Sequence, residues 1–316
     1  MKYTAFKFIL FLPLIIFSQV VEPIYITLNG DITNPDQEVS GLTWYKDNLI
    51  LLPQYPTDKI YSIPKQQIID FLDSSRTTIL PKEIKWNSSG LDKRIGGFEG
   101  YESIIFNDDT VYITIEAKRH KINAGFIARG IIDTIKNEIN INKKSLKEIK
   151  TPVMLLNMTY ETILISNNSV ITIYEVNSAK VNKSPVYHQF DKNLKSDNIT
   201  PFPFTEYRIT DATEIDNEGK FWVTNYFWPG DYNLLKLDLN YPIMKKKDIK
   251  PVERLLEFQI VNENIVRTET PPISIKLSEF DDSRNWEGIV RLDDKGFLIV
   301  TDKFPGTILA FIPFTE

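Results

Sequence analysis

The sequence of 316 residues contains no cysteine and only two histidines. The absence of cysteine excludes disulfides, thiolate zinc sites, iron–sulfur clusters and a cysteine nucleophile. Two histidines are too few for a histidine-rich metal site, and they allow at most two histidine-based triads. Chemistry in this chain must therefore depend mainly on carboxylates, amides, hydroxyls and basic groups. Charged groups are plentiful, since there are 42 acidic and 37 basic residues.

The first residues have the pattern of an export signal. An apolar run, Phe8–Phe17, follows Lys2 and Lys7 and is closed by Ser18 and Gln19. The run is too short to span a bilayer and fits the hydrophobic region of a secretory signal peptide. We therefore predict a signal peptide over residues 1–19 and a single domain over residues 20–316. A first β-strand or an uncleaved anchor is the alternative, and a lipoprotein is excluded because no cysteine can carry the lipid.

The mature chain is expected to be acidic. Removing Lys2 and Lys7 leaves 35 basic and 42 acidic residues, a net charge of −7. No broad basic surface is evident, so we expect no nucleic-acid partner. We expect a secreted or periplasmic monomer without a membrane span.

Helical periodicity is scarce, and the best helix candidate is the short segment Ser62–Phe71. Elsewhere, short β-branched and aromatic runs alternate with turns of Asn, Asp, Gly and Pro. Many short strands at regular spacing predict an all-β sandwich, barrel or propeller. The clearest strand candidates are Asn48–Leu52, Val111–Ile115, Val170–Tyr174, Phe221–Thr224 and Phe297–Thr301.

An internal repeat distinguishes these architectures. Tyr101–Glu116 reads YESIIFNDDTVYITIE, and Tyr160–Glu175 reads YETILISNNSVITIYE. Three looser copies are Glu38–Gln54, Asp211–Asn225 and Glu287–Asp302. Each copy begins at a carboxylate, crosses two strand candidates around a polar turn and ends on a polar residue.

The repeats recur about every 60 residues. A further strand candidate follows most pairs, as at Lys59–Ile63, Gly125–Ile131, Asn233–Leu239 and Thr307–Pro313. Three or four antiparallel strands repeated radially predict a β-propeller of four-stranded blades. Five repeats are visible, and the long interval between residues 211 and 287 leaves five or six blades open. Pro23–Leu28 is expected to complete the last blade and close the ring, whereas a large β-sandwich would not explain the fixed spacing.

In a propeller, the carboxylates that begin the repeats would converge near the axis. Such a ring needs protonation or a cation to limit repulsion, and Ca²⁺ accepts six to eight oxygen ligands. The alternative is structural, because acidic residues at strand starts often accept backbone N–H bonds from the next blade. The predicted metal ligands are Glu38, Glu102, Glu161, Asp211 and Glu287.

A second polar ring ends the repeats at the same face, at Gln54, Glu116, Glu175, Asn225 and Asp302. We expect Glu116 and Asp302 to act as catalytic acids or bases. Basic residues follow, so the mixture suits a small anionic substrate such as a phosphate ester. Solvated loops are the alternative for these segments. The predicted substrate contacts are Asn225, Lys118, Arg119, His120 and Lys303.

Four segments resemble the esterase-like phytase propellers in content and order: Glu38–Trp44, Tyr101–Lys118, Tyr207–Asn225 and Asn285–Phe311. More remotely, the chain is similar to calcium-dependent lactonase and strictosidine-synthase-like propellers. The resemblance implies phosphoester or ester hydrolysis, with Glu38, Glu102, Glu116, Asp211, Glu287 and Asp302 as the matching acids. Gln54 and Asn225 depart from the family's pattern.

The leading hypothesis is an exported propeller that binds Ca²⁺ near its axis and hydrolyses a phosphoester or related ester. The alternative is a non-catalytic propeller that binds a ligand or a protein, with an axial ion that only holds the blades together.

Overall fold

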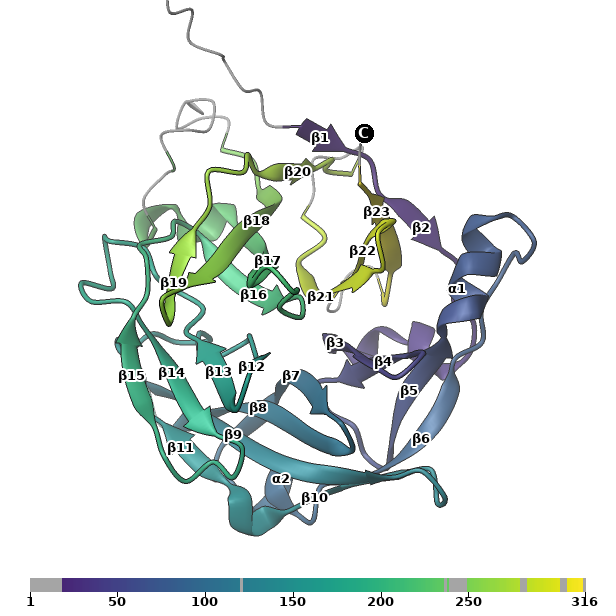
Figure 1. Cartoon of the computed structure of the whole chain (residues 1–316), viewed down its shortest axis with the longest axis horizontal. Coiled ribbons are helices and arrows are strands. Elements are labelled where there is room, and N and C mark those ends of the chain that lie inside the picture. Colours follow the sequence, from purple (N-terminus) through teal and green to yellow (C-terminus); the bar gives the residue numbers. More distant parts are fainter. Residues whose placement is uncertain are drawn as a thin grey trace, which may run out of the picture.

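The chain forms a ring of β-sheets. The computed structural model describes residues 19–119, 122–235, 238, 249–278, 283–301 and 306–314. In Figure 1 these residues form five blades around one axis, which confirms the predicted all-β propeller. The interval between residues 211 and 287 contributes strands to one blade only, so the described residues give no sixth blade. The signal-peptide prediction falls on residues outside the described part, apart from Gln19.

The first two blades are joined at their outer edges, where β6 pairs with β10 in parallel. The first blade consists of β3 (Val39–Tyr45), β4 (Asn48–Pro53), β5 (Lys59–Pro64) and β6 (Lys82–Asn87). The second consists of β7 (Phe98–Asn107), β8 (Thr110–Arg119), β9 (Ile122–Asp133), β10 (Glu138–Ile141) and β11 (Lys147–Ile149).

The third and fourth blades are separate sheets, and the first N-terminal strand joins the fourth blade. The third blade consists of β12 (Leu164–Ser166), β13 (Ser169–Ile173), β14 (Val186–Asp191) and β15 (Asn198–Pro201). The fourth consists of β16 (Arg208–Ala212), β17 (Lys220–Phe227), β18 (Val252–Val261), β19 (Asn264–Arg267) and β20 (Ile273–Ile275). The N-terminal strand β1 (Gln19–Val21) pairs in parallel with β20.

We expected the third strand of the fourth blade at residues 233–239. This prediction is wrong for the described residues of that segment, which form no strand. Asn233 ends the 3-10 helix η4 (Pro229–Asn233), and β18 supplies the third strand instead. Tyr232 and Leu234 are nonetheless packed against a core cluster, which explains the apolar pattern without a strand.

The fifth blade closes the ring as predicted. It consists of β21 (Trp286–Leu292), β22 (Gly296–Thr301), β23 (Leu309–Pro313) and the N-terminal strand β2 (Ile24–Ile26). Strand β2 pairs antiparallel with β23, so the edge of the last blade is covered by the start of the chain. A strand from near the start of the described chain and the last described strand therefore lie in one sheet (Figure 1).

Helices occupy only the connections. The predicted helix over Ser62–Phe71 begins later, because Ser62–Pro64 complete β5, and α1 runs from Lys65 to Leu72. The other helical segments are α2 (Leu91–Arg94), η1 (Asp31–Thr33), η2 (Pro35–Gln37) and η3 (Lys143–Ser145). None of the helices in the described part is both long and apolar enough to cross a membrane.

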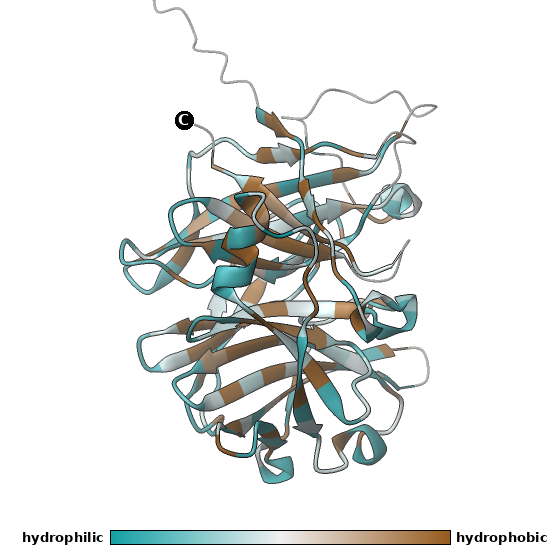
Figure 2. Cartoon of the chain, turned by 90° about the vertical axis from the view of Figure 1, so that its right-hand side faces the viewer, coloured by the Kyte–Doolittle hydropathy of each residue, from teal (hydrophilic) through white to brown (hydrophobic). Residues whose placement is uncertain are grey.

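Alternating side chains along each strand connect neighbouring blades. On β4, Leu49 and Leu51 pack with the fifth blade, while Ile50 and Leu52 pack with the second. Because side chains of a strand point alternately to opposite faces, a strand buried on both faces becomes continuously apolar. Figure 2 shows this pattern, with hydrophobic strands and hydrophilic connections. The core is therefore a series of layers between blades.

Tight turns join the first two strands of the first, second and third blades and explain the similar length of their repeats. Two-residue connections require residues that tolerate a positive φ. Asp108 and Asn167 take these positions with φ of 53° and 50°. In these blades the short turn places the end of the second strand beside the start of the first strand, at the same face of the propeller.

Candidate active site

β-Bulges lie near the starts of four inner strands, where the carboxylates were expected to converge. The pairing register shifts around Ser40, Glu102, Thr210 and Glu287, so each of these residues is extra in its strand. A bulge turns a side chain out of the regular alternation and is common beside active sites. Glu102 and Glu287 thus occupy equivalent positions. Asp211 lies one residue beyond this position and Glu38 two residues before it, a difference that the sequence alignment did not resolve.

Five carboxylates gather around the axis. We call Glu102, Glu116, Glu161, Glu175 and Glu287 the axial carboxylates; they come from the second, third and fifth blades. Glu161 is central, because burial and the charges of Glu175, Glu287, Glu102 and Glu116 raise the pKa of its carboxyl well above its usual value. The predicted convergence of Glu102, Glu161 and Glu287 is therefore found in the structure.

Glu116 on β8 is oriented by two hydrogen bonds. Thr159 Oγ1 donates to Glu116 Oε2 at 2.9 Å, and the Asn123 side-chain amide donates to Oε1. Burial, and then the charge of Glu175, raise the pKa of Glu116 to about 7. A carboxyl group with this pKa can accept and return a proton near neutral pH.

Glu175 is completely buried and is held by a cation. Arg208 Nη1 lies 3.1 Å from Glu175 Oε1, and Arg208 Nε lies 2.8 Å from Asp231 Oδ2. Burial raises the pKa of Glu175 to about 7 although Arg208 lowers it. The main chain of Thr159 accepts the N–H of Glu175 at 2.8 Å, so one residue connects Glu116 and Glu175.

Three oxygens of this cluster are buried and accept no hydrogen bond from an N–H or a hydroxyl in the part of the chain described, although the Glu161 and Glu175 carboxyl groups interact with each other. They are Glu161 Oε2, Glu175 Oε2 and Asn123 Oδ1. Buried polar atoms are nearly always satisfied, so each of these oxygens calls for a donor, a proton or a cation. Glu161 itself is half-buried, but its Oε2 atom is enclosed.

The axial region is further defined by Gln54 and Tyr55. Gln54 Nε2 donates to Glu102 Oε1 at 3.2 Å, and its side chain crosses Gly100, where an added Cβ would lie only 2.2 Å from it. Tyr55 is 45% exposed, and its burial, together with Glu102, Glu38 and other acids, raises the pKa of its hydroxyl. This places Glu38 near the acidic cluster, at its half-buried edge.

Asp211 has a structural environment. It is buried, and it accepts the backbone N–H of Ile289 at 2.9 Å and the hydroxyl of Ser103 at 3.2 Å. Burial raises the pKa of Asp211, whereas these bonds and backbone N–H groups of Ala212 and Leu42 lower it. Its carboxyl group therefore connects the fourth blade with the fifth, the second and the first.

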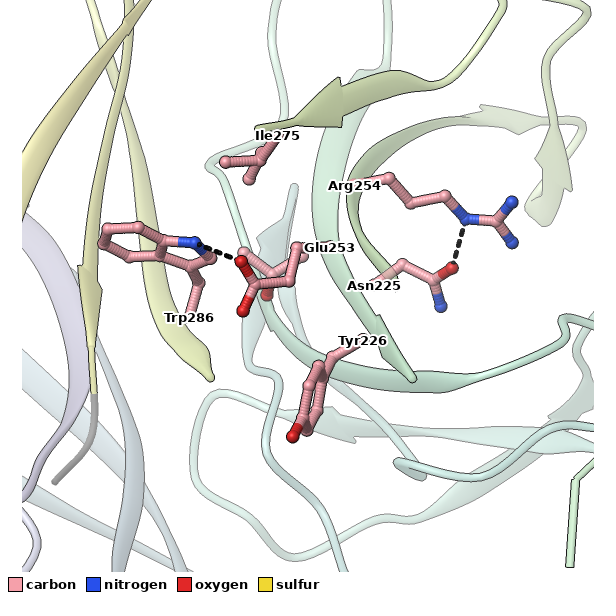
Figure 3. A pocket seen from close by; sticks show the side chains of 7 residues that line it. Asn225, Tyr226, Glu253, Arg254, Ile275 and Trp286 are labelled. Carbon is pink, nitrogen blue, oxygen red and sulfur yellow. Dashed lines mark hydrogen bonds between the residues drawn. The ribbon is translucent and has the colours of Figure 1, made fainter. Parts of the chain in front are cut away.

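Asn225 is buried within its own blade. Its side-chain amide donates to the carbonyls of Glu206 and Arg208, and its Oδ1 accepts Arg254 Nε at 2.7 Å. Arg254 is also paired with Asp238 at 2.9 Å. Figure 3 shows Asn225 and Arg254 beside a small cavity of about 10 Å³, close to the minimum that can hold one water molecule.

Two of the basic residues that were predicted to bind substrate, Lys118 and Arg119, lie at the end of β8. Lys118 is exposed at the end of β8. Arg119 is paired with Glu148 at 2.9 Å and lies over the ring of Phe126, toward the β9–β11 side of the blade. His120, Asp302 and Lys303 lie outside the described residues, so their predicted roles remain predictions.

Sequence reasoning did not single out the residues that surround the acids. Arg208, Asp231, Asn123 and Thr159 each lie outside the sixteen-residue repeats that it compared. One available signal was the charged residue Arg208 between the apolar residues Tyr207 and Ile209. A buried cation requires a buried anion, and this requirement pointed to a partner such as Glu175.

Sequence comparison assigns no family to the chain. No protein-family model matches it, and no curated protein matches it. Similar solved structures include a glucose dehydrogenase (7% identity, TM-score 0.45, covering 89% of this chain and 98% of that one). Others are a glycosyl hydrolase from Bacteroides ovatus (8%, 0.48, 87% and 84%) and an exo-1,5-α-L-arabinanase from a bovine ruminal metagenomic library (9%, 0.47, 89% and 94%). Similarities this distant assign no activity.

Proposed function

We propose that the axial carboxylates bind a divalent cation, with Ca²⁺ as the first candidate, and that the loaded site hydrolyses a phosphoester or related ester. The observation that carries this proposal is the pair of buried oxygens, Glu161 Oε2 and Glu175 Oε2, which no other described group satisfies, while the two carboxyl groups bond only to each other there. Both belong to a cluster whose charges repel one another. A hard cation would satisfy these oxygens and offset the repulsion together.

The donor chemistry fits such an ion. Carboxylate and amide oxygens from Glu161, Glu175 and Asn123 are the ligand types that Ca²⁺ prefers, and cysteine is absent. Within the described residues, however, no three acidic or histidine side chains are already arranged as a metal site. The ion is therefore expected to bind with an adjustment of side chains, which the flexible coordination of Ca²⁺ permits.

Bound at these oxygens, the cation would polarise the scissile phosphoryl or carbonyl group and lower the pKa of a coordinated water. Glu116 is the residue suited to accept a proton, because its pKa is about 7 and two side chains orient it. Arg208 would hold Glu175 in position and limit the negative charge of the cluster.

Electrostatics makes the cation requirement testable. Five carboxylates face the axis, and a negatively charged ester would be repelled by them in the absence of a cation. The resemblance to esterase-like phytases supports the choice of a phosphoester panel. Lys118 is an exposed cation close in sequence to Glu116 and supports an anionic substrate.

The first experiment is a metal analysis of the purified chain, followed by a phosphoester and ester screen with Ca²⁺ and with a chelator. We expect Ca²⁺ to raise the melting temperature and to be required for turnover. Glu161→Gln and Glu287→Gln should weaken both effects, while Glu263→Gln, an exposed acid on the β18–β19 turn, should change neither. Turnover that persists undiminished in chelator would reject the metal-dependent mechanism.

The environment of Asp211 favours a second function. Its carboxyl group already joins blades through backbone N–H bonds, as expected if the acidic ring holds the propeller together. In that case the chain is a non-catalytic binding propeller with a structural ion. Calcium would then raise the melting temperature, but no member of the panel would be hydrolysed.

A further inference from the structure

Glu253 is a buried acid on β18 that the proposed chemistry does not use. Its Oε1 accepts the backbone N–H groups of Arg284 and Asn285 at 2.5 and 2.9 Å, and the hydroxyl of Ser283 at 2.9 Å. Its Oε2 accepts the indole N–H of Trp286 at 3.1 Å, as Figure 3 shows. One carboxyl group thus accepts hydrogen bonds from four consecutive residues, 283–286, at the start of β21.

The segment ends in an unusual backbone conformation. Asn285 has φ of 49°, a left-handed conformation that non-glycine residues adopt only when their surroundings support it. In this conformation Asn285 Nδ2 donates to Glu287 Oε1 at 2.6 Å. The neighbouring carbonyl of Trp286 accepts Thr210 Oγ1 at 2.7 Å, which attaches the segment to the inner strand of the fourth blade.

We infer that Glu253 is a positioning residue for the axial cluster, and that it acts through Asn285 to set the orientation of the Glu287 carboxylate. The bond from Asn285 occupies Glu287 Oε1. Glu287 in turn contributes to the charge around Glu161, so its orientation matters at the centre of the cluster. This inference rests on the proposed function, in which Glu287 belongs to the cation-binding cluster.

A buried carboxylate with four donors could also have a purely structural role, in which it only stabilises the fold. The two roles differ at Glu287, because a purely structural Glu253 would stabilise the fold without changing the orientation of the Glu287 carboxylate. Residues that orient metal ligands through hydrogen bonds typically change metal affinity about 10- to 100-fold when they are replaced. Cation affinity is therefore the informative measurement.

The test measures Ca²⁺ affinity of the full chain by titration calorimetry for Glu253→Gln, Asn285→Gly and the double variant. Glycine keeps the positive φ of Asn285 and removes only the side-chain amide. We expect each single variant to bind Ca²⁺ about 10- to 100-fold more weakly. The Ca²⁺ affinity of the double variant should equal that of the single variant with the lower affinity. Both substitutions interrupt the same series of hydrogen bonds, from Glu253 through Asn285 to Glu287.

Glu257→Gln is the matched control. Glu257 lies on the same strand and accepts the hydroxyls of Thr268 and Thr270, away from the axis. We expect the Glu257→Gln variant to bind Ca²⁺ with the affinity of the unmodified chain. Unchanged affinity in folded Glu253→Gln and Asn285→Gly would overturn the inference, and if Glu253→Gln does not fold, Asn285→Gly alone decides.

A crystal structure of Asn285→Gly separates this inference from the proposed function. If the unmodified chain binds no Ca²⁺, the proposed function fails and the orientation of Glu287 becomes the deciding measurement. A rotated Glu287 carboxylate in the variant supports the positioning role. An unchanged carboxylate overturns it.

Discussion

Arg208 Nη1 lies 3.1 Å from Glu175 Oε1, and Glu175 is completely buried. The guanidinium also bonds to Asp231, so one cation serves two acids from different parts of the chain. The arrangement explains how a buried carboxylate is tolerated next to Glu161 and Glu116. It also means that the third and fourth blades are joined by charge as well as by apolar contacts.

Replacing Arg208 should therefore be costly. Arg208→Met leaves Glu175 and Asp231 without their cation, and breaking a buried pair in this way typically costs about 3 to 5 kcal/mol. We expect the free energy of unfolding to fall by an amount near the lower end of this range, about 3 kcal/mol, because Glu175 can take up a proton. Chemical denaturation at pH 7 measures it. Lys220→Met, which removes an exposed pair with Glu218, should cost less than about 1 kcal/mol.

Stability should fall as pH rises through the acidic to neutral range in chelator. The pKa of both Glu116 and Glu175 is raised to about 7, so the folded chain retains protons that the unfolded chain releases near pH 4.3. The folded state therefore loses stability between about pH 4.5 and pH 7. Denaturation at pH 5 and pH 8 should show this loss.

Two changes should reduce that pH dependence. Glu116→Gln removes one of the titrating groups, and Ca²⁺ at pH 8 should restore stability by offsetting the charge of the others. A stability that is equal at pH 5 and pH 8 in chelator would contradict the raised pKa values.

Asp211 should behave as a structural residue. Asp211→Ala leaves the buried N–H of Ile289 without its acceptor, which costs about 1 to 3 kcal/mol. Titration calorimetry on the folded variant should still give the Ca²⁺ affinity of the unmodified chain. A large loss of Ca²⁺ affinity would instead support the original prediction that Asp211 is a ligand.

Closure of the ring by β2 should be essential for a stable monomeric state. Ile26 is 3% exposed and packs in the cluster between the first and fifth blades. Ile26→Asp should lower the free energy of unfolding by about 3 kcal/mol or more and expose the edge of β23, which promotes association. Melting curves and size-exclusion chromatography test this, with Tyr25→Asp as the control because Tyr25 is 48% exposed.

The fold was largely predictable from the sequence. Strand alternation, polar turns and a repeated spacing are local features, and they correctly indicated five repeats and closure by the N-terminal strand. The strand expected at residues 233–239, which is absent over its described residues, shows the limit of this reasoning. An apolar segment at the end of a 3-10 helix can have the same local composition as a strand.

The sequence by itself determined that carboxylates would lead the chemistry and that several would start at equivalent places in the blades. Only the tertiary structure decided which of them meet. A one-residue shift in a strand reverses the direction of a side chain, and the bulges at Glu102 and Glu287 make such shifts without a sequence signature. Likewise, Arg208 and Asp231 reach Glu175 through contacts between distant segments, which no spacing along the chain encodes.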